Sequence, residues 1–409
     1  MKEIELLAPA GSFEKAKIAF LYGADAVYCG TSSLSLRARA DMENEDLEKT
    51  IKYAHEIGKK VYVTLNIFAW DEKYEEIVEM AKKLEKLKPD GIIAADVGVI
   101  DTLKQYAPSV PINISTQANI ISLRDCEFWY NNGAKRVIMA REMNKEQLKY
   151  IMENKPADLE VEIFIHGAIC FAFSGRCFLS DFLSCRSANL GDCVQSCRWS
   201  YNLYAEEKNN PGEFMPIETS EYGTSIFSSK DLCLIKELPE IIEMGVDSLK
   251  IEGRLKTEYY IASVINAYRN AIDDYKKDPK NYDATKYLNE LEKVKTRGLT
   301  TFYFNDRKNK DIQEYGGRQY NENYEFGGKI IEYNEEKSII EIKNKLQAGD
   351  ILEIIIPNQI EPLEFKILKL WDYETDEEID AVSPGVKGQK VKMKLPIKCE
   401  KDWILRRKK

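Results

Sequence analysis

The chain has 409 residues, of which 44% are hydrophobic and 31% charged, a balance typical of folded globular proteins rather than disordered ones. It carries 59 Lys and Arg against 68 Asp and Glu, and the net charge of −9 argues against broad, non-specific nucleic-acid binding, although a local basic patch could still dock one folded RNA. No apolar run reaches the roughly 18 residues that cross a bilayer, and the N-terminus lacks a signal-peptide pattern. We therefore expect a cytoplasmic protein without a membrane segment.

Short strand-like runs alternate with amphipathic helical segments through residues 1–275. The predicted strands cover residues 4–8, 26–29, 61–66, 91–95, 112–115, 136–140, 161–166 and 248–252. Eight strands that are each followed by a helix predict an α/β fold of the (β/α)8, TIM-like barrel type. A doubly wound open sheet is the alternative, but no G-x-G-x-x-G motif follows the first strand, which removes its usual dinucleotide-binding version.

Polar side chains alternate with apolar ones along four of these strands. The polar faces carry Tyr62, Thr64 and Asn66; Asn113, Ser115 and Gln117; Glu162, Phe164 and His166; and Lys250, Glu252 and Arg254. The apolar faces suit packing against helices, so the polar faces should point into the barrel. A buried hydrogen-bonded network is one interpretation, and an active site at the carboxyl ends of the strands is the interpretation we favour.

The connection after the seventh strand, residues 171–228, is much longer than the others, and long connections in compact domains are usually functional or disordered. Five of the nine cysteines lie in it or just before it: Cys170, Cys177, Cys185, Cys193 and Cys197. Disulfides are rare in a reducing compartment, so clustered thiols indicate metal or redox chemistry. We predict that a helix over residues 228–245 follows this insertion and carries Cys233.

The spacing of Cys170, Cys177, Cys193 and Cys197 narrows the kind of site. Their separations of x6, x15 and x3 are mostly wider than the C-x2–4-C pairs of structural zinc sites. Four thiolates suit zinc or an iron–sulfur cluster, and the wide gaps favour ligands wrapped around the larger group. Unligated thiols remain a third interpretation, and Cys233 is the substitute if Cys197 is not the fourth ligand.

Beyond residue 275 the pattern changes. Residues 276–324 read as a helical extension and a polar linker. Residues 325–409 contain short strand-like runs separated by turns, which predicts a small C-terminal all-β domain of barrel or sandwich type.

Several short motifs extend across the predicted barrel. They include Leu7-Ala-Pro-Ala-Gly11, His166-Gly-Ala-Ile-Cys170, Ser174-Gly-Arg-Cys177, Cys193-x-x-x-Cys197-Arg198-Trp199, Ser229-Lys-Asp-Leu232 and Lys250-Ile-Glu-Gly-Arg254. These motifs resemble the collagenase-like peptidase family, peptidase family U32. The resemblance spans the barrel and extends to the C-terminal β domain.

The resemblance implies a divided function. The family name reflects a collagen-degrading activity, whereas better-understood members are oxygen-independent RNA and quinone hydroxylases with a 4Fe-4S cluster on cysteines. The chain's length, its Cys-x3-Cys-Arg-Trp motif and its β tail are most similar to the tRNA hydroxylases that make 5-hydroxyuridine at the wobble position. That subgroup is associated with prephenate, so tRNA and a small anionic metabolite are the implied partners.

This interpretation gives each candidate residue a role. The metal ligands are Cys170, Cys177, Cys193 and Cys197; the catalytic residues are His166, Glu252 and Lys250; and the substrate-binding residues are Arg254, Arg198, Asn66 and Gln117. One alternative is a peptidase with a Cys170–His166 nucleophile pair, although no Ser–His–Asp or H-E-x-x-H pattern is present. Another is a non-catalytic RNA-binding module with a structural metal, in which Arg176, Arg186 and Arg198 alternate with aromatic residues such as Phe171 and Phe178.

Overall fold

The structure is a computed structural model. It describes residues 2–31, 34–36, 41–170, 172–199, 201, 203–206, 208–209, 211–212, 214–217, 229–306, 309, 311–312, 323–385 and 389–409. The chain divides into two compact units. The first is Met1–Ala16, Asp25–Leu255 and Thr296–Tyr320, and the second is Lys17–Ala24, Lys256–Lys295 and Asn321–Lys409. This division differs from the predicted boundaries at residues 275 and 324, because the helical residues from 256 to 295 group with the C-terminal domain.

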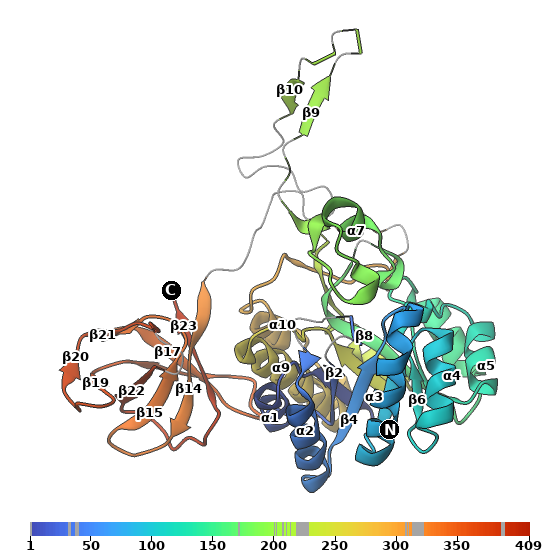
Figure 1. Ribbon diagram of the computed structural model, residues 1–409. Helices are drawn as coiled ribbons and strands as arrows, with labels where there is room; N and C mark the ends of the chain where they lie inside the picture. The colour runs from blue at the N-terminus through green and yellow to red at the C-terminus, as the bar shows by residue number, and fades with distance from the viewer. Residues whose placement is uncertain are drawn as a thin grey trace. The chain divides into compact units, whose positions relative to one another are not determined.

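In the described residues, the first unit contains a closed barrel of eight parallel strands (Figure 1). The strands are β1 (Glu5–Pro9), β2 (Ala26–Thr31), β4 (Lys60–Leu65), β5 (Gly91–Ala94), β6 (Ile112–Ile114), β7 (Ala134–Ile138), β8 (Glu160–Ala168) and β12 (Ser248–Ile251). Each pairs with the next, and β12 pairs with both β8 and β1, which closes the barrel. Every predicted strand overlaps one of these, so the predicted barrel fold is confirmed. A short strand, β3 (Asp41–Met42), pairs with the end of β2.

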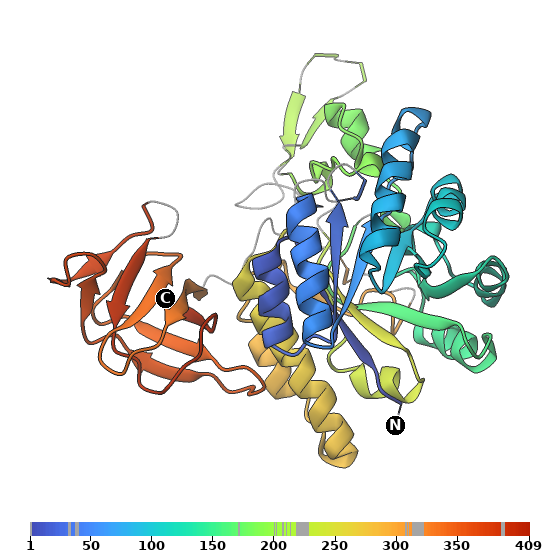
Figure 2. The ribbon, with the colours of Figure 1, turned by 60° about the horizontal axis from the view of Figure 1, so that its bottom comes forward.

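Amphipathic helices cover the outside of the barrel, blue to green in Figure 2. They are α2 (Asn44–Glu56), α3 (Tyr74–Leu87), α4 (Val97–Tyr106), α5 (Leu123–Asn131) and α6 (Lys145–Asn154). In α3 the buried residues Ile77, Met80, Ala81 and Leu84 follow helical spacing, so one stripe packs inward and the charged residues between them face solvent. None of the helices in the described residues is long and apolar enough to cross a membrane.

The helix predicted over residues 228–245 is wrong in its first half. Residues Asp231–Cys233 form strand β11, and only Leu238–Glu243 form a helix, α8. Strand β11 pairs antiparallel with the end of β8 and parallel with β13 (Leu299–Thr300), and all of its residues are buried. These strand pairings satisfy the backbone, so tertiary context overrides the helical pattern of the sequence.

The insertion after β8 contains helix α7 (Leu179–Ser184) and an antiparallel pair, β9 (Leu203–Glu206) and β10 (Phe214–Ile217). Short 3-10 turns connect the cysteine-bearing segments around α7. Phe171 and residues 218–228, which belong to the predicted insertion, lie outside the described residues.

The second unit contains the predicted all-β domain. Its main sheet has the antiparallel order β18-β17-β23-β14-β15-β22-β19-β20 in the described residues. The bounds are β14 (Tyr324–Glu332), β15 (Ser338–Ile342), β17 (Ile351–Ile355), β18 (Leu363–Lys366), β19 (Leu370–Asp372), β20 (Glu378–Ile379), β22 (Lys390–Met393) and β23 (Ile404–Lys408), with β16 (Leu346–Gln347) and β21 (Ala381–Val382) as a separate pair. Helices α9 (Glu258–Lys277) and α10 (Thr285–Leu291) and the last residues of α1 (Phe13–Leu21) also belong to this unit.

Candidate active site

A cavity of about 440 Å³ lies at the carboxyl ends of the barrel strands. Nine of the eleven predicted site residues line it: Asn66, Gln117, Lys250, Glu252, Arg254, Cys170, Cys177, Cys193 and Cys197. This is the end of the barrel at which TIM-type enzymes carry their active sites, because the loops that follow the strands converge there.

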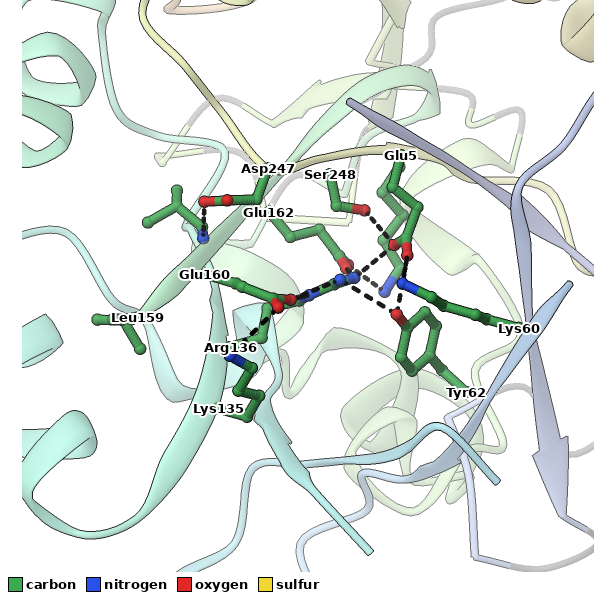
Figure 3. Close-up of polar contacts among 12 residues, drawn as sticks. Glu5, Lys60, Tyr62, Lys135, Arg136, Leu159, Glu160, Glu162, Asp247 and Ser248 are labelled. Atoms are coloured by element: carbon green, nitrogen blue, oxygen red, sulfur yellow. Dashed lines mark hydrogen bonds and ion pairs between the residues drawn. The ribbon is translucent and has the colours of Figure 1, made fainter. Parts of the chain in front are cut away.

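Toward the amino ends of the strands, a buried ion network fills the barrel interior, as Figure 3 shows. The Arg136 guanidinium on β7 donates to Glu5 on β1 at 2.6 Å and to Glu162 on β8 at 2.9 Å. It also donates to Glu160 at 2.9 Å and to the Tyr62 hydroxyl on β4 at 3.1 Å. Burial acts to lower the pKa of Arg136, but the Glu162 and Glu5 carboxylates outweigh burial and the pKa is raised. Arg136 therefore stays charged and ties four strands together.

Lys250 on β12 connects this network to the cavity. Its ammonium donates to the second oxygen of Glu162 at 2.7 Å and lies 4.4 Å from the centre of the Tyr28 ring and 5.4 Å from that of Phe164. Burial lowers the pKa of Lys250, and the Glu162 carboxylate opposes this shift. A lysine with a lowered pKa exchanges its proton closer to neutral pH than a solvated lysine does.

Glu252 and Arg254 follow β12 and are positioned by the backbone around them. Gly167 on β8 has a φ of +109°, and a Cβ there would lie 2.6 Å from the Glu252 carbonyl oxygen, so only glycine fits at this crossing. Arg254 is 4% exposed, and its Nη1 donates to the Ser35 hydroxyl at 2.9 Å and the Thr64 hydroxyl at 3.1 Å. These hydroxyls fix the guanidinium at the cavity wall.

Asn66 and Gln117 form a pair of amides in the cavity lining. Asn66 Nδ2 donates to Gln117 Oε1 at 2.7 Å, and the Ser115 hydroxyl donates to the same oxygen at 3.3 Å. Asn66 Oδ1 accepts from the Leu36 backbone N–H at 3.2 Å. Because both amide oxygens already accept hydrogen bonds, each side chain is held in one orientation. The pair is suited to hold the polar edge of a flat ligand.

Two further arginines line the cavity. Arg141 was not predicted; it donates to the Ala168 carbonyl at 3.0 Å and lies 5.2 Å from the centre of the Phe164 ring. Arg176, predicted only as part of an RNA-binding surface, donates to the Gln117 carbonyl at 2.9 Å. Arg141 comes directly after the sixth predicted strand. Residues at that end of a barrel strand commonly line the active site, so this position could have identified it from the sequence.

The charge of the cavity lining is opposite to the net charge of the protein. Among the described lining residues, the cations are Arg141, Arg176, Lys250 and Arg254, and Glu252 is the only carboxylate. The whole sequence carries a formal charge of −9. The local positive field therefore attracts anionic ligands into the cavity, although the chain as a whole is negatively charged.

The four predicted metal-binding thiols line this same cavity. Cys170 follows β8, and Cys177, Cys193 and Cys197 come from the insertion. Burial raises the pKa of Cys197; Arg198 opposes the shift, and the other three thiols add to it. That mutual influence is expected for thiols gathered in one place.

The backbone around the thiols offers hydrogen bonds to sulfur. The Leu179 N–H donates to Cys177 Sγ at 3.4 Å, and the Gln195 N–H donates to Cys193 Sγ at 3.3 Å. Such donors stabilise thiolate ligands and tune the potential of iron–sulfur clusters, so this donor set fits a cluster. In the described part of the chain, no group of three or more His, Cys, Asp or Glu side chains is arranged so that it could hold a metal ion.

His166 and Cys233 are not part of the cavity lining. They lie opposite each other in the β8–β11 pairing, and both are buried. The β8–β12 pairing shifts register between Phe164 and His166, so the alternation that places Phe164 in the cavity does not continue to His166. Neither residue is therefore among the described residues that line the cavity with the four thiols.

Arg198 also lies outside the cavity lining. Together with Arg186, it forms hydrogen bonds that stabilise the loops of the insertion. Arg198 donates to the Gln195 side chain at 2.8 Å and to the Ile169 carbonyl at 3.1 Å. Arg186 donates to Asp192 at 2.8 Å. Of the three arginines predicted to alternate with aromatic residues on an RNA-binding surface, only Arg176 reaches the cavity.

Comparison with known proteins gives three differently named relatives. The tRNA hydroxylation protein P1 of Bacillus subtilis (strain 168) is 38% identical, over 99% of this chain and 95% of its own. The 23S rRNA 5-hydroxycytidine C2501 synthase of Escherichia coli (strain K12) is 30% identical, over 87% of this chain and 53% of its own. The collagenase of Porphyromonas gingivalis (strain ATCC BAA-308 / W83) is 30% identical, over 97% of this chain and 95% of its own.

The family comparison covers both parts of the chain. Peptidase family U32 matches residues 11–314, which include the barrel strands from β2 to β12 and the cysteine insertion. The C-terminal domain of the same family matches residues 322–406, the all-β domain. The predicted resemblance is confirmed over nearly the whole sequence, and the chain belongs to peptidase family U32.

Proposed function

We propose that this protein is an RNA hydroxylase and, more narrowly, a tRNA hydroxylase that forms 5-hydroxyuridine at the wobble position with a 4Fe-4S cluster. The observation that carries the proposal is the cavity at the strand ends, which combines four thiols with a positively charged lining. Relatives named for tRNA hydroxylation and for rRNA hydroxycytidine synthesis support RNA as the substrate class.

The cavity offers a division of roles. Cys170, Cys177, Cys193 and Cys197 would hold the cluster, which supplies one-electron redox chemistry when bound. All four line the cavity, so a cluster there would lie beside any ligand that the cavity holds. Zinc on the same thiols is the alternative metal, and it would not supply redox chemistry.

The remaining lining residues would bind and orient the reactants. Lys250 and Arg254 suit an anionic metabolite such as prephenate, because charge-assisted hydrogen bonds to carboxylates are strong in a partly desolvated site. Glu252 suits the acceptance of a proton and Lys250 its return. Asn66 and Gln117 suit the polar edge of a uracil base. His166 is not among the described residues that line the cavity, so this division of roles leaves it out.

An RNA loop suits this site better than a duplex does. Chemistry on a base requires the base to leave its stack, and loop bases are already largely unstacked. Phe178 lines the cavity and is also exposed, so it stands at the rim, where an aromatic ring can stack on an unstacked base.

The test compares Cys177→Ser with Cys185→Ser in cells that lack the gene. Cys185 lies in the same insertion, but it is exposed and does not line the cavity, so it is the matched control. After anaerobic purification we expect Cys177→Ser to lose iron, and its cells to lose 5-hydroxyuridine in mass spectrometry of tRNA nucleosides. Cys185→Ser should retain both. Full iron content and normal 5-hydroxyuridine in Cys177→Ser would contradict the proposal.

A peptidase is the second candidate, favoured by the similarity to the collagenase of Porphyromonas gingivalis over 97% of this chain. A Cys170–His166 pair would require the imidazole within hydrogen-bond reach of the thiol, and His166 does not line the cavity in which Cys170 lies. Gelatin cleavage by the purified protein, together with unchanged tRNA nucleosides in the deletion strain, would favour the peptidase. RNA binding without any change in nucleosides would favour a non-catalytic binding module.

A further inference from the structure

A second cavity, of about 390 Å³, shares Cys170 with the lining of the first. Cys170 and Ala172 line both cavities, so the two cavities are adjacent. A ligand group in the second cavity is therefore a close neighbour of a ligand in the first.

Three of the seven described residues that line the second cavity are aromatic: Phe173, Tyr303 and Phe302, of which Phe302 is 6% exposed. Phe173 is 50% exposed, which is high for phenylalanine, a residue that is usually buried. Phe302 and Tyr303 come from the segment that follows β13, and their ring centres are 4.2 Å apart with the planes at 47°. Aromatic faces of this kind offer stacking surfaces to flat ligands.

The position of Phe302 is fixed by its backbone. Its φ of +51° lies in the left-handed region, which is costly for a bulky side chain. Its N–H donates to the Thr300 hydroxyl at 3.1 Å, and its carbonyl accepts from the Asn309 side chain at 2.8 Å. Strained backbone that is held in place by such contacts tends to occur at ligand sites.

The second cavity differs from the first in charge. Glu142 is the only charged residue among its described lining residues. Both Glu142 oxygens already accept hydrogen bonds from Ser174, one from the backbone N–H and one from the hydroxyl, each at 2.6 Å. The described lining offers no cation to a phosphate or a carboxylate. It suits a neutral, flat group.

We propose that the second cavity binds, by stacking, an unpaired nucleobase adjacent to the target base in the RNA loop. The proposal rests on the proposed RNA hydroxylase function and adds a binding site to it. The positive first cavity takes the target nucleotide, and the second cavity, which shares Cys170 and Ala172 with the first, takes the neighbouring base. Base–aromatic stacking tolerates any base, so the site contributes affinity and fixes the position of the strand rather than reading its sequence.

The test is a double-mutant cycle between the protein and the RNA. The probe is an anticodon stem-loop RNA with uridine at the wobble position, with an abasic residue placed in turn on either side of that uridine. We expect Phe173→Ala to weaken binding of the intact loop by about five- to one-hundred-fold, and to leave binding of one of the two abasic RNAs unchanged. Phe173→Leu, which keeps apolar volume without a ring face, should behave like Phe173→Ala.

Phe128→Ala is the matched control, because Phe128 is 57% exposed on α5 and lines neither cavity. It should not change RNA affinity. Iron content and melting temperature report whether each variant is intact; if Phe173→Ala loses iron, Tyr303→Leu on the other part of the wall replaces it in the cycle.

If the effect of Phe173→Ala on the binding free energy is additive with that of each abasic substitution, the stacking site is overturned. The RNA hydroxylase proposal would remain in place. Failure of the wild-type protein to bind the stem-loop at all would overturn both. The two failures are therefore distinguishable from the wild-type measurement alone.

Discussion

Replacing Glu162 by Gln is the sharpest test of the barrel interior. Glu162 is 0% exposed, and its two oxygens accept from Lys250 at 2.7 Å and from Arg136 at 2.9 Å. The Gln side chain keeps the shape but removes the charge, so Lys250 loses the carboxylate that compensates it, whereas Arg136 keeps Glu5 and Glu160. Breaking a buried ion pair from one side costs about 3–5 kcal/mol of stability, because the remaining charge stays buried without compensation.

This cost converts into a measurable change in thermal stability. Each kcal/mol lowers the melting temperature by about 2–4 °C for a domain of 150–250 residues, so we expect a fall of about 6–20 °C in the unfolding of the barrel. Differential scanning fluorimetry under anaerobic conditions measures it, and iron content shows whether the protein is otherwise intact.

The stability deficit should also depend on pH. Burial lowers the pKa of Lys250, and loss of the Glu162 carboxylate, which opposes that shift, lowers it further. Between the folded pKa and the unfolded value of about 10.4, the unfolded state binds more protons than the folded state. Stability from this group therefore rises with pH across that interval, and the deficit of Glu162→Gln should shrink as the pH is raised.

Glu160→Gln is the matched control in the same network. Glu160 accepts from the Arg136 guanidinium at 2.9 Å, but its side chain is 31% exposed. Water can replace the lost interaction, so we expect a cost of about 1 kcal/mol or less. An equal or larger loss of stability in Glu160→Gln than in Glu162→Gln would refute the reasoning.

Two further predictions concern the cavity and the second unit. Arg254→Gln should weaken prephenate binding by about ten- to one-hundred-fold in calorimetry, because it removes a charge-assisted contact, whereas Arg186→Gln outside the cavity should leave it unchanged. Arg406 is fully buried against Glu353, so Arg406→Met should lower the melting temperature without changing iron content, and adding Glu353→Leu should recover part of the loss. Iron loss in Arg406→Met, or no recovery in the double variant, would contradict this expectation.

Side-chain alternation predicted much of the cavity from the sequence. Asn66, Gln117, Lys250, Glu252 and Arg254 were assigned to the barrel interior from their strand positions, and all five line the cavity. The prediction works because side chains alternate between the two faces of a strand. When one face packs on helices, the residues between must point to the other face, here the barrel interior. The position of the active end also follows from the fold, since the loops after parallel strands meet at one end of a barrel.

Features that depend on pairing between distant strands could not be predicted in the same way. The register shift beside His166 is a property of the β8–β12 pair, and no pattern within either strand marks it. Cys233 lies in a run with helical spacing, but β8 offers it a strand partner. Arg136 contacts Glu5 from a position 131 residues away in sequence, and only barrel closure places the two together.

The last strand shows a third kind of limit. Residues Ile404–Lys408 end the chain in a basic run that resembles a solvated tail, yet β23 lies between β17 and β14 in the sheet. Buried Arg406 is compensated by Glu353 and by Glu290, which are far from it in sequence. Composition alone cannot identify such a strand, because the counter-charges that permit its burial come from other elements.

The contrast between the acidic chain and its basic cavity bears on how RNA would be selected. With 68 acidic against 59 basic residues, the net charge of the chain is unfavourable for a phosphate backbone, and we expect binding to gain little from duplex contacts. The four cations of the described cavity lining act only on a group that enters the cavity. A base in a helix cannot enter without unstacking, which costs free energy. An unpaired loop base is already largely unstacked, so its cost of entry is smaller. We infer that access to the cavity, rather than charge attraction over the surface, restricts the proposed substrate to a loop.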